Sequence, residues 1–435
     1  MVAIKSLVDS KKGLVNRSIF TDEELYKQEL EQIFGRCWLF IGHESQIARP
    51  NDFVATYMGE DPVLLTRDSK GKLHAFLNMC RHRGNRICRA DYGNAPSFMC
   101  TYHGWTFATD GKLVGVPGYK EAYFEELDRS QWGLVEAGQI DSYKGIVFAT
   151  WDKQAPTLLD YLGDMAWWLD LVVDRREGGT EVLGGSHKWV LHANWKFGAD
   201  NFGGDGYHIP VTHGSTGLAG ISRRQPLSQS IYSPDRHPIR PGNGHAVLGG
   251  YSGPGRNPAM EYSGTDPITR YRIDNLPEMQ RRIGELHAKQ GGINVSNMFP
   301  NFTWHGAPMI RNWHPRGPRQ MEVWSYCIVD KVAPQEIKDA LRRNYTKTFG
   351  PTGGLEQDDM NNWLQCTQSG MSPAAKRVDM NVAMGIGHDS KSEIMPGTLS
   401  ASPSEANQRA FYARWQEMME APSWSQISIA PRTMK

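Results

Sequence analysis

The sequence predicts an α+β fold, in which a small all-β domain is followed by a larger domain with an antiparallel sheet flanked by helices. Two observations lead to this prediction. Short apolar runs separated by glycine-containing turns fill residues 38–155, as they do in small β-sandwiches and barrels. After residue 155, segments with helical periodicity and helix-start signals alternate with β-type runs. The predicted domains are therefore 38–155 and 156–435, with a helical segment at 1–37 that packs on the larger domain.

The first helix is predicted over residues 21–34. Thr21 and Glu24 match a capping box, and apolar side chains then recur close to one stripe of the helix. The strands of the small domain are expected where β-branched and aromatic residues lie between glycine turns. These runs are 53–57, 63–66, 73–78, 97–108, 113–116 and 146–151.

The larger domain is predicted to combine one antiparallel sheet with several helices. Its strands are expected at 181–195, 295–304, 311–313 and 321–329. Its helices are expected at 158–173, at 276–289, at 334–349 with Pro334 in the first turn, and from a capping box at 402–405 to about 419. The segment 214–270 is rich in Gly, Pro and Ser and gives no clear prediction.

Composition excludes several classes of protein. The chain has 435 residues, of which 39% are hydrophobic and 22% charged, as in a globular protein with a sizeable core. A formal net charge of +1 gives no indication of nucleic acid or an anionic membrane as a partner. No run of about 18 apolar residues occurs, so no membrane span is predicted. The N-terminus has no apolar secretory segment, and we expect a cytoplasmic protein.

Two matched cysteine–histidine pairs form the first candidate metal site. Cys80-Arg-His82 and Cys100-Thr-Tyr-His103 each follow a predicted strand, and Gly84 and Gly104 come shortly after. Two such loops can bind a two-iron cluster with the cysteines on one iron and the histidines on the other, which raises the reduction potential. The alternative is a Cys2His2 zinc site, but zinc ligands are rarely mixed in this way within both halves. The other cysteines have no metal-like spacing and are expected to be buried thiols: Cys37, Cys88, Cys327 and Cys366.

The second candidate site lies in the segment 201–215, which contains Asp205, His208 and His213. Asp205 and His208 are three residues apart and would share a face of a helical turn, whereas Pro210 and several glycines predict a bend before His213. Two neutral imidazoles need an anionic oxygen ligand to complete the facial triad of a non-heme iron site. The segment 355–360 offers Asp358 and Asp359 for this position. The remaining histidines, among them His43, His74, His187, His192, His305 and His314, show no ligand spacing and are expected to be packed or surface residues.

Together these motifs resemble those of the large (α) subunit of Rieske-type aromatic-ring-hydroxylating dioxygenases of the naphthalene and biphenyl type. Cys-x-His followed by Cys-x-x-His and Gly-Trp resembles the Rieske [2Fe–2S] signature, and the wider similarity extends over roughly residues 17–420. The resemblance implies that the 38–155 domain holds one [2Fe–2S] cluster and the 156–435 domain one mononuclear Fe(II). It also implies that Asp359, rather than Asp358, is the third iron ligand.

The resemblance assigns further roles. Asp205 would act catalytically, by bridging His208 to His103 of a neighbouring subunit, so that the enzyme works as a ring, most simply a trimer of α subunits. The residue Asn201 would lie near the iron. Phe202, Phe349 and Leu355 would line the substrate pocket, and Leu355 stands where some naphthalene-type relatives carry a larger aromatic residue.

The implied reaction adds both atoms of dioxygen to an aromatic ring and gives a cis-dihydrodiol. The electrons would come from NAD(P)H through a reductase and a ferredoxin, since this chain has no dinucleotide-binding fingerprint. A small β subunit, giving α3β3, is also implied. The expected substrate is an uncharged, polycyclic hydrocarbon; the basic segment 311–319 leaves an aromatic carboxylate as an alternative.

Three other functions remain open from the sequence. A Rieske monooxygenase or demethylase shares both metal motifs. An electron-transfer protein without oxygenase activity would need only the first motif, and the long segment that follows it argues against this function. A zinc-stabilised binding protein would contain neither the two-iron cluster nor the mononuclear iron.

Overall fold

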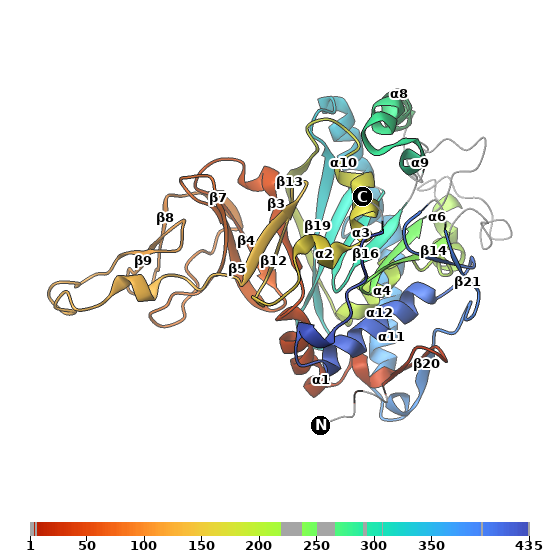
Figure 1. Ribbon diagram of the computed structural model, residues 1–435, viewed down its shortest axis with the longest axis horizontal. Helices are drawn as coiled ribbons and strands as arrows, with labels where there is room; N and C mark the ends of the chain where they lie inside the picture. The colour runs from red at the N-terminus through yellow and green to blue at the C-terminus, as the bar shows by residue number, and fades with distance from the viewer. Residues whose placement is uncertain are drawn as a thin grey trace. The chain divides into compact units, whose positions relative to one another are not determined.

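The computed structural model describes residues 4, 7–218, 237–249, 266–289, 294–306, 308–392 and 395–433. The chain divides into two compact units (Figure 1). One is the continuous segment Phe34–Leu158, and the other combines Met1–Ile33 with Leu159–Lys435. Most of the segment that gave no clear prediction, 214–270, lies outside the described residues. Among the described residues, no helix has the length and apolar content needed to cross a lipid bilayer.

The unit Phe34–Leu158 is built from antiparallel strands. Its largest sheet has the order β6 (Leu73–Leu77), β5 (Asp61–Arg67), β4 (Asp52–Met58) and β7 (Tyr92–Asn94). Two three-stranded sheets accompany it: β10 (Leu113–Gly115), β9 (Thr106–Ala108) and β8 (Ser97–Met99) in one, and β11 (Gln139–Tyr143), β12 (Ile146–Thr150) and β3 (Leu39–His43) in the other. The predicted strand 97–108 is thus two strands, with the second cysteine–histidine pair in the connection between them.

A shared apolar core supports both cysteine–histidine pairs. Cys80 and Cys100 are each 2% exposed and belong to the same core cluster as Phe98, Trp105 and Phe107. Cys80 follows β6 and Cys100 follows β8 directly, so the strand ends hold the two cysteines in place. The core therefore holds the cysteine end of each loop, while His82 and His103 are only partly buried.

The other unit is organised around a sheet of nine antiparallel strands among the described residues. Its order is β13 (Thr180–Leu191), β19 (Met321–Asp330), β18 (Met309–Pro315), β17 (Phe302–His305), β16 (Val295–Met298), β15 (His245–Gly249), β14 (His237–Gly242), β22 (Thr398–Ser400) and β21 (Asp389–Lys391). The central strands are almost entirely buried, as expected for a sheet covered by helices. A small sheet of β1 (Val8–Asp9), β2 (Leu14–Asn16) and β20 (Asp379–Asn381) ties the N-terminal segment to residues near the C-terminus.

Helices pack on this sheet (Figure 1). Helix α4 (Trp195–Phe202) packs on β16, β17 and β18, α12 (Ala406–Glu420) packs on β14 and β15, and α10 (Gln335–Phe349) packs on β19. The other helices are α1 (Glu23–Glu29), α2 (Leu158–Leu162), α3 (Met165–Val173), α5 (Ile209–Thr212), α6 (Gly214–Leu218), α8 (Asp266–Ile283), α9 (Glu285–Ala288) and α11 (Gly354–Gly370). The predicted helix 334–349 is confirmed, with Pro334 as the residue before it.

Both predicted capping boxes are wrong in detail. The carboxylate of Asp22, not Thr21, accepts hydrogen bonds from the backbone N–H groups of Glu24 and Leu25, so α1 starts at Glu23. At the other end of the chain, α12 begins at Ala406, where the Ser404 hydroxyl accepts from the first helical N–H. In both places a neighbouring short polar side chain competes for the same backbone donors, and sequence spacing alone does not choose between them.

Other elements differ from the predictions at glycines and bends. The predicted helix 158–173 is two helices, because Gly163 adopts a φ of +51° between α2 and α3. The predicted strand 181–195 ends at Leu191, after which Asn194 caps α4. The predicted strand 295–304 is the hairpin of β16 and β17. Cys366 is exposed rather than buried, because it lies on an outward face of α11.

A buried ion pair anchors the start of α4. The Nζ atom of Lys196 lies 2.5 Å from Oε1 of Glu29, and both side chains are fully buried. The indole N–H groups of Trp195 and Trp415 also donate to the Glu29 carboxylate, at 2.9 and 2.7 Å. Buried charges persist only when they are paired and hydrogen-bonded in this way. The network links α1, α4 and α12 and so holds the helix that leads into the segment 201–215.

Candidate metal centres and substrate pocket

The two cysteine–histidine loops, residues 80–85 and 100–105, have the same backbone geometry. The N–H of Cys80 donates to the carbonyl of Asn85, and the N–H of Gly84 donates back to the carbonyl of Cys80. In the second loop, the N–H of Cys100 donates to Trp105 and that of Gly104 to Cys100. Gly84 and Gly104 have φ values of +74° and +72°, a region that favours glycine. The two loops are thus repeats of one structural unit.

The donor atoms of these loops fit a cluster with mixed ligands. The rings of His82 and His103 lie with their centroids 4.5 Å apart, and Nδ1 of His82 is buried without a hydrogen bond. The ring of His82 also stacks on Trp105, with centroids 5.1 Å apart and planes 9° apart. Two buried thiols and two adjacent imidazoles are the donor set that a Rieske cluster requires.

The environment distinguishes the two thiols. Burial raises the pKa of Cys80. Burial acts in the same direction on Cys100, but the backbone N–H of Tyr102 and the amide of Asn85 donate to its sulfur and lower its pKa. The Nδ2 atom of Asn85 lies 3.6 Å from Sγ of Cys100, so one loop stabilises the thiolate of the other.

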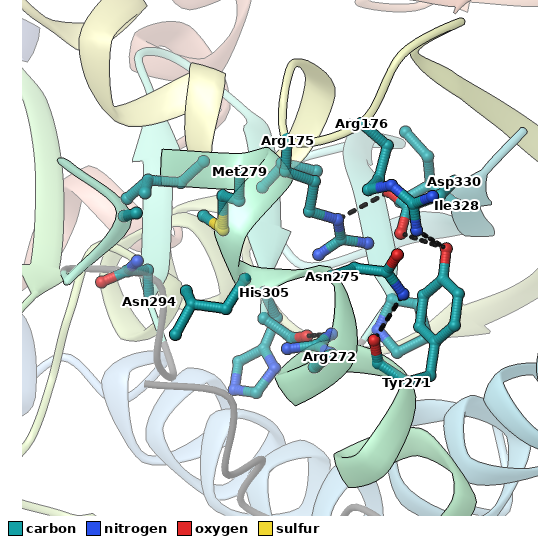
Figure 2. Close-up of a pocket in the computed structure, with 16 residues that line it drawn as sticks. Arg175, Arg176, Tyr271, Arg272, Asn275, Met279, Asn294, His305, Ile328 and Asp330 are labelled. Atoms are coloured by element: carbon teal, nitrogen blue, oxygen red, sulfur yellow. Dashed lines mark hydrogen bonds and ion pairs between the residues drawn. The ribbon is translucent and has the colours of Figure 1, made fainter. Parts of the chain in front are cut away.

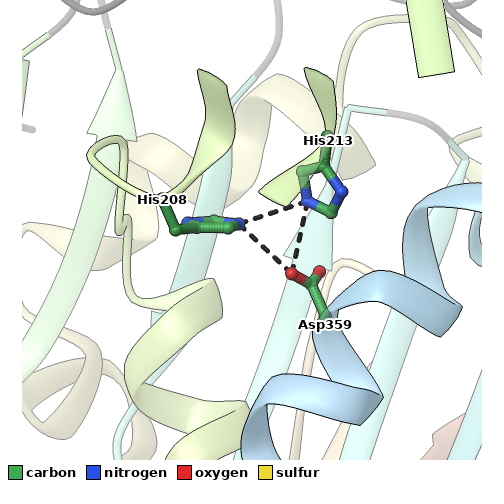
Figure 3. Close-up of side chains that lie close together, drawn as sticks. All are labelled: His208, His213 and Asp359. Carbon is green, nitrogen blue, oxygen red and sulfur yellow. Dashed lines mark hydrogen bonds and ion pairs between the residues drawn. The ribbon is translucent and has the colours of Figure 1, made fainter. Parts of the chain in front are cut away.

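His208, His213 and Asp359 converge in the larger unit (Figure 3). The Nε2 atoms of the two histidines lie 3.2 Å apart, and Oδ1 of Asp359 lies 3.3 Å from one and 3.2 Å from the other. His213 and Asp359 are buried, while His208 is partly buried. Figure 3 shows the carboxylate approaching from α11 and the imidazoles from the segment around α5.

A tight turn places the histidines. Asp205 and His208, predicted to share a face of a helical turn, lie in the connection between α4 and α5. The Asp205 carboxylate accepts hydrogen bonds from the backbone N–H groups of Tyr207 and His208, which closes the turn. Gly204 has a φ of +110°, and a Cβ atom there would lie 2.8 Å from Cβ of Leu248. Only glycine fits this approach of the turn to β15.

Each candidate ligand imidazole has a second carboxylate behind it. Oδ2 of Asp205 lies 3.4 Å from Nδ1 of His208, and Oδ2 of Asp358 lies 3.5 Å from Nδ1 of His213. Asp359 faces both Nε2 atoms, whereas Asp358 reaches only the rear of one ring. Carboxylates placed in this way orient metal-binding histidines and fix their tautomers. The geometry therefore favours Asp359 as the third ligand and gives Asp358 an orienting position.

The carboxylates at the site favour a positively charged group beside them. Burial would lower the pKa of His208, but Asp205 and Asp359 outweigh burial and raise the pKa to about 10. Burial would likewise raise the pKa of Asp359, but His208 and His213 hold it well below its usual range. Oδ1 of Asp359 is a buried oxygen with no hydrogen-bond donor. A cation bound by the three side chains would take the place of the proton on the histidines.

A pocket adjoins the three side chains, and we call it the iron-site pocket. Its empty volume is about 470 Å³, including space open to solvent. Most of the residues predicted to bind iron or substrate in this domain line it: Asn201, Phe202, Asp205, His208, His213, Phe349, Leu355 and Asp359. Asp358 and the segment 311–319 do not. The sequence analysis missed Gly204, Ile209, Leu248, Val295 and His305. Apolar residues on a strand have the same sequence pattern whether they line a pocket or the core, so the sequence did not single them out. His305 was expected to be a packed or surface residue.

Arg311 supports this site from outside the pocket. Its guanidinium donates two hydrogen bonds to Glu356, at 3.0 and 2.8 Å, and one to the carbonyl of Phe349, at 2.8 Å. Both charged side chains are fully buried. Glu356 lies one helical turn before Asp359 on α11. The guanidinium therefore fixes the helix that carries the candidate ligand, and it is fully buried and does not line the pocket, so it does not face a substrate carboxylate there.

We predict that Cys100→Ser removes the cluster from the 80–85 and 100–105 loops, because a hydroxyl does not replace a thiolate ligand. The visible absorption of the cluster and the inorganic sulfide should be lost, while iron at His208 and His213 is retained. Cys88→Ser is the matched control, since Cys88 is also buried in this core but its sulfur lies beside the carbonyl of Ala90. A normal spectrum for Cys100→Ser would contradict the assignment.

We predict that Arg311→Met weakens iron binding at His208, His213 and Asp359 by about 10- to 100-fold, as expected for loss of a group that positions a ligand. Iron remaining after dialysis against a weak chelator is the measurement, and the cluster absorption should be unchanged. Arg319→Met serves as the control, because Arg319 forms an exposed ion pair with Glu23. Equal iron retention by both variants would show that Arg311 does not position Asp359.

Comparisons with known proteins agree with this geometry. The chain matches the Rieske [2Fe-2S] domain family over residues 37–138 and the catalytic domain of the ring hydroxylating alpha subunits over residues 180–421. It is 41% identical to the biphenyl 2,3-dioxygenase subunit alpha of Rhodococcus jostii (strain RHA1), covering 98% of this chain and 93% of the relative. It is 38% identical to a benzene 1,2-dioxygenase subunit alpha of Pseudomonas putida, covering 98% and 95%.

A solved structure of a naphthalene 1,2-dioxygenase mutant bound to phenanthrene superposes with a TM-score of 0.90 at 33% identity, covering 97% of this chain and 95% of the other. These matches confirm the predicted α+β fold with a small all-β Rieske domain, and they confirm both iron cofactors. They set aside the zinc protein and the electron-transfer protein, because both family domains are present. The chain belongs to the alpha subunits of the Rieske-type ring-hydroxylating dioxygenases, which carry one [2Fe–2S] cluster and one mononuclear non-heme iron.

Proposed function

We propose that this chain is the large subunit of a terminal oxygenase that adds both atoms of dioxygen to an uncharged polycyclic aromatic hydrocarbon. The product is a cis-dihydrodiol. The observation that carries the proposal is the composition of the iron-site pocket, where His208, His213 and Asp359 lie beside the apolar side chains of Phe202 and Leu355. A metal-binding triad next to an apolar cavity fits a substrate that has no polar handle.

The charges around the pocket support an uncharged substrate. Arg311 is committed to Glu356, and further along the same basic segment Arg316 pairs with Glu322. Among the described residues, no lysine or arginine lines the iron-site pocket. A carboxylate substrate would leave its charge unpaired in this pocket, which is costly.

The size of the pocket supports a substrate with more than one ring. Its empty volume of about 470 Å³ is within the range of small-molecule sites. Leu355 is a smaller side chain than the aromatic residue in some naphthalene-type relatives, and this leaves more room near Asp359. Relatives of the chain are named for biphenyl and naphthalene, and the naphthalene dioxygenase mutant holds phenanthrene.

The side chains around the iron have distinct roles in this proposal. When bound, the cluster delivers electrons singly and the mononuclear iron activates dioxygen. His208, His213 and Asp359 hold that iron, Asn201 lies at the same pocket, and Phe202, Phe349 and Leu355 orient the ring by contact. Asp205 orients His208 and, we propose, links it to His103 of a neighbouring copy of the chain, in a ring of three α subunits.

The proposed partners rest on the resemblance to the family and on the lack of a dinucleotide-binding fingerprint in this sequence. NAD(P)H is oxidised by a separate reductase, and a ferredoxin carries the electrons to the Rieske domain. A small β subunit completes an α3β3 assembly, and the enzyme acts in the cytoplasm.

The reaction is tested with the purified α subunit and its β subunit, ferredoxin, a reductase, NADH and a panel of aromatics from one to four rings. Under ¹⁸O₂, we predict that naphthalene or biphenyl gives a dihydrodiol with two labelled oxygen atoms, identified by mass. A single labelled oxygen would indicate a monooxygenase. Turnover of aromatic carboxylates alone would contradict the uncharged substrate.

We predict that Asp205→Ala keeps both iron centres filled but reduces dihydrodiol formation below detection. A role limited to orienting His208 would cost only about 10- to 100-fold, so the size of the loss separates the two roles. Normal product formation would defeat the bridging role.

Assemblies that mix two inactive variants test whether electrons pass between subunits. Chains with Cys100→Ser lack the cluster, and chains with Asp359→Ala lack the third iron ligand, so each is inactive alone. If electrons pass between copies, co-assembled chains regain activity, because the cluster of one copy serves the iron of the next. Mixtures without activity would show that each chain uses only its own cluster.

A further inference from the structure

A second cavity lies next to the iron-site pocket (Figure 2). Its empty volume is about 740 Å³, including space open to solvent. Figure 2 shows Arg175, Arg176, Tyr271 and Asp330 on one side of it and Asn294 on the other. Between these polar groups the lining is largely apolar and comes from α3, α8, α9 and β19: Leu171, Val172, Leu276, Met279, Ala288 and Ile328. Such a lining suits a flat hydrocarbon.

Ion pairs hold helix α8 over this cavity. Arg176 contacts Glu278 at 2.7 Å and donates to the Tyr271 hydroxyl at 2.7 Å. Arg175 contacts Asp330 at 2.7 Å, and Tyr271 donates to the same carboxylate. These contacts fasten α8 to the segment that follows α3 and to β19, on one side of the cavity.

Among the described residues, the β16–β17 strand pair lies between the two spaces. Val295 of β16 and His305 of β17 are cross-strand partners, and both line the iron-site pocket. The adjacent residues Asn294 and Gly306, joined by a backbone hydrogen bond of 2.9 Å, line the second cavity. His305 lines both spaces. Its side chain thus forms part of the wall between them.

Backbone pairing and ring packing hold the His305 side chain in place. Its backbone is paired on both sides, with Val295 and with Met309, and the residue is 6% exposed. The ring lies against Phe349 of the iron-site pocket, with centroids 4.5 Å apart. A residue with a fixed backbone and a packed ring can be shortened without moving the strands, so truncation at this position should open the wall.

We propose that His305 determines substrate length: its ring closes the iron-site pocket toward the second cavity, and a smaller residue would join the two spaces. This inference rests on the proposed function, since it concerns which aromatic hydrocarbons that pocket accepts. The ring beyond the reacting one would then enter the second cavity, between α8 and β19.

The test compares His305→Ala with the wild-type holoenzyme on naphthalene and pyrene. We expect the ratio of kcat/KM for pyrene over naphthalene to rise at least about tenfold, the usual effect of matching a hydrophobic pocket to its ligand. Pyrene binding is measured separately, from the emission bands that report its transfer out of water. An unchanged ratio together with unchanged pyrene affinity would overturn the proposal.

Three further variants make the result specific. His305→Phe keeps a ring of similar size and should behave as wild type, whereas a gain in this variant would show that the imidazole's polarity, not its size, restricts the substrate. His305→Val is a second shortened variant in case the alanine variant folds poorly. In the His305→Ala background, Met279→Trp fills the second cavity and should abolish the gain. A gain that survives this change would refute the role of the second cavity.

Naphthalene oxidation by the wild-type enzyme distinguishes failure of the proposed function from failure of the role of His305. If the wild-type enzyme oxidises no aromatic hydrocarbon, the proposed function fails. Pyrene binding still tests the wall in that case, because it does not depend on turnover.

Discussion

The structure depends on bringing two imidazoles and one carboxylate from distant parts of the chain within 3.3 Å of one another. Uncompensated, this arrangement is unfavourable, because it buries Asp359 and partly buries His208 with no hydrogen-bond donor for Oδ1 of the aspartate. A bound cation would offset this cost, and the surrounding fold holds the three groups close together. Much of the larger unit can be understood as the means of holding this geometry.

Two buried ion pairs contribute to that rigidity. Lys196 and Glu29 hold the start of α4, which leads into the histidine segment, and Arg311 and Glu356 hold the first turn of α11, which carries Asp359. Buried ion pairs contribute little net stability compared with apolar residues of the same volume. Their geometry is nevertheless specific, because each charge accepts only one arrangement of partners. In this protein they hold the two segments that carry His208, His213 and Asp359, which could bind a metal ion.

The Rieske domain also holds its candidate metal ligands in place, but it does so by local backbone hydrogen bonds rather than by buried ion pairs. Its two loops repeat one hydrogen-bonding pattern, so the donor atoms of Cys80 and Cys100 are set by local backbone geometry at the ends of strands. The loops also rest on the apolar core that contains Cys80 and Cys100. This difference explains why the cluster motif is compact in sequence, whereas the ligands of the mononuclear iron are dispersed.

The sequence alone was enough to predict the family, the order of its domains, most strands of the β domain, and the residues that we propose surround the iron. Short motifs carry this information because local spacing limits which ligands can face one metal. Only the tertiary structure placed Asp358 behind the His213 ring, moved Arg311 from a candidate substrate contact to a support of α11, and placed His305 at the wall of the pocket. These assignments depend on which side chains meet after α11 and the β16–β17 pair pack together, and a linear sequence carries no distance between such segments.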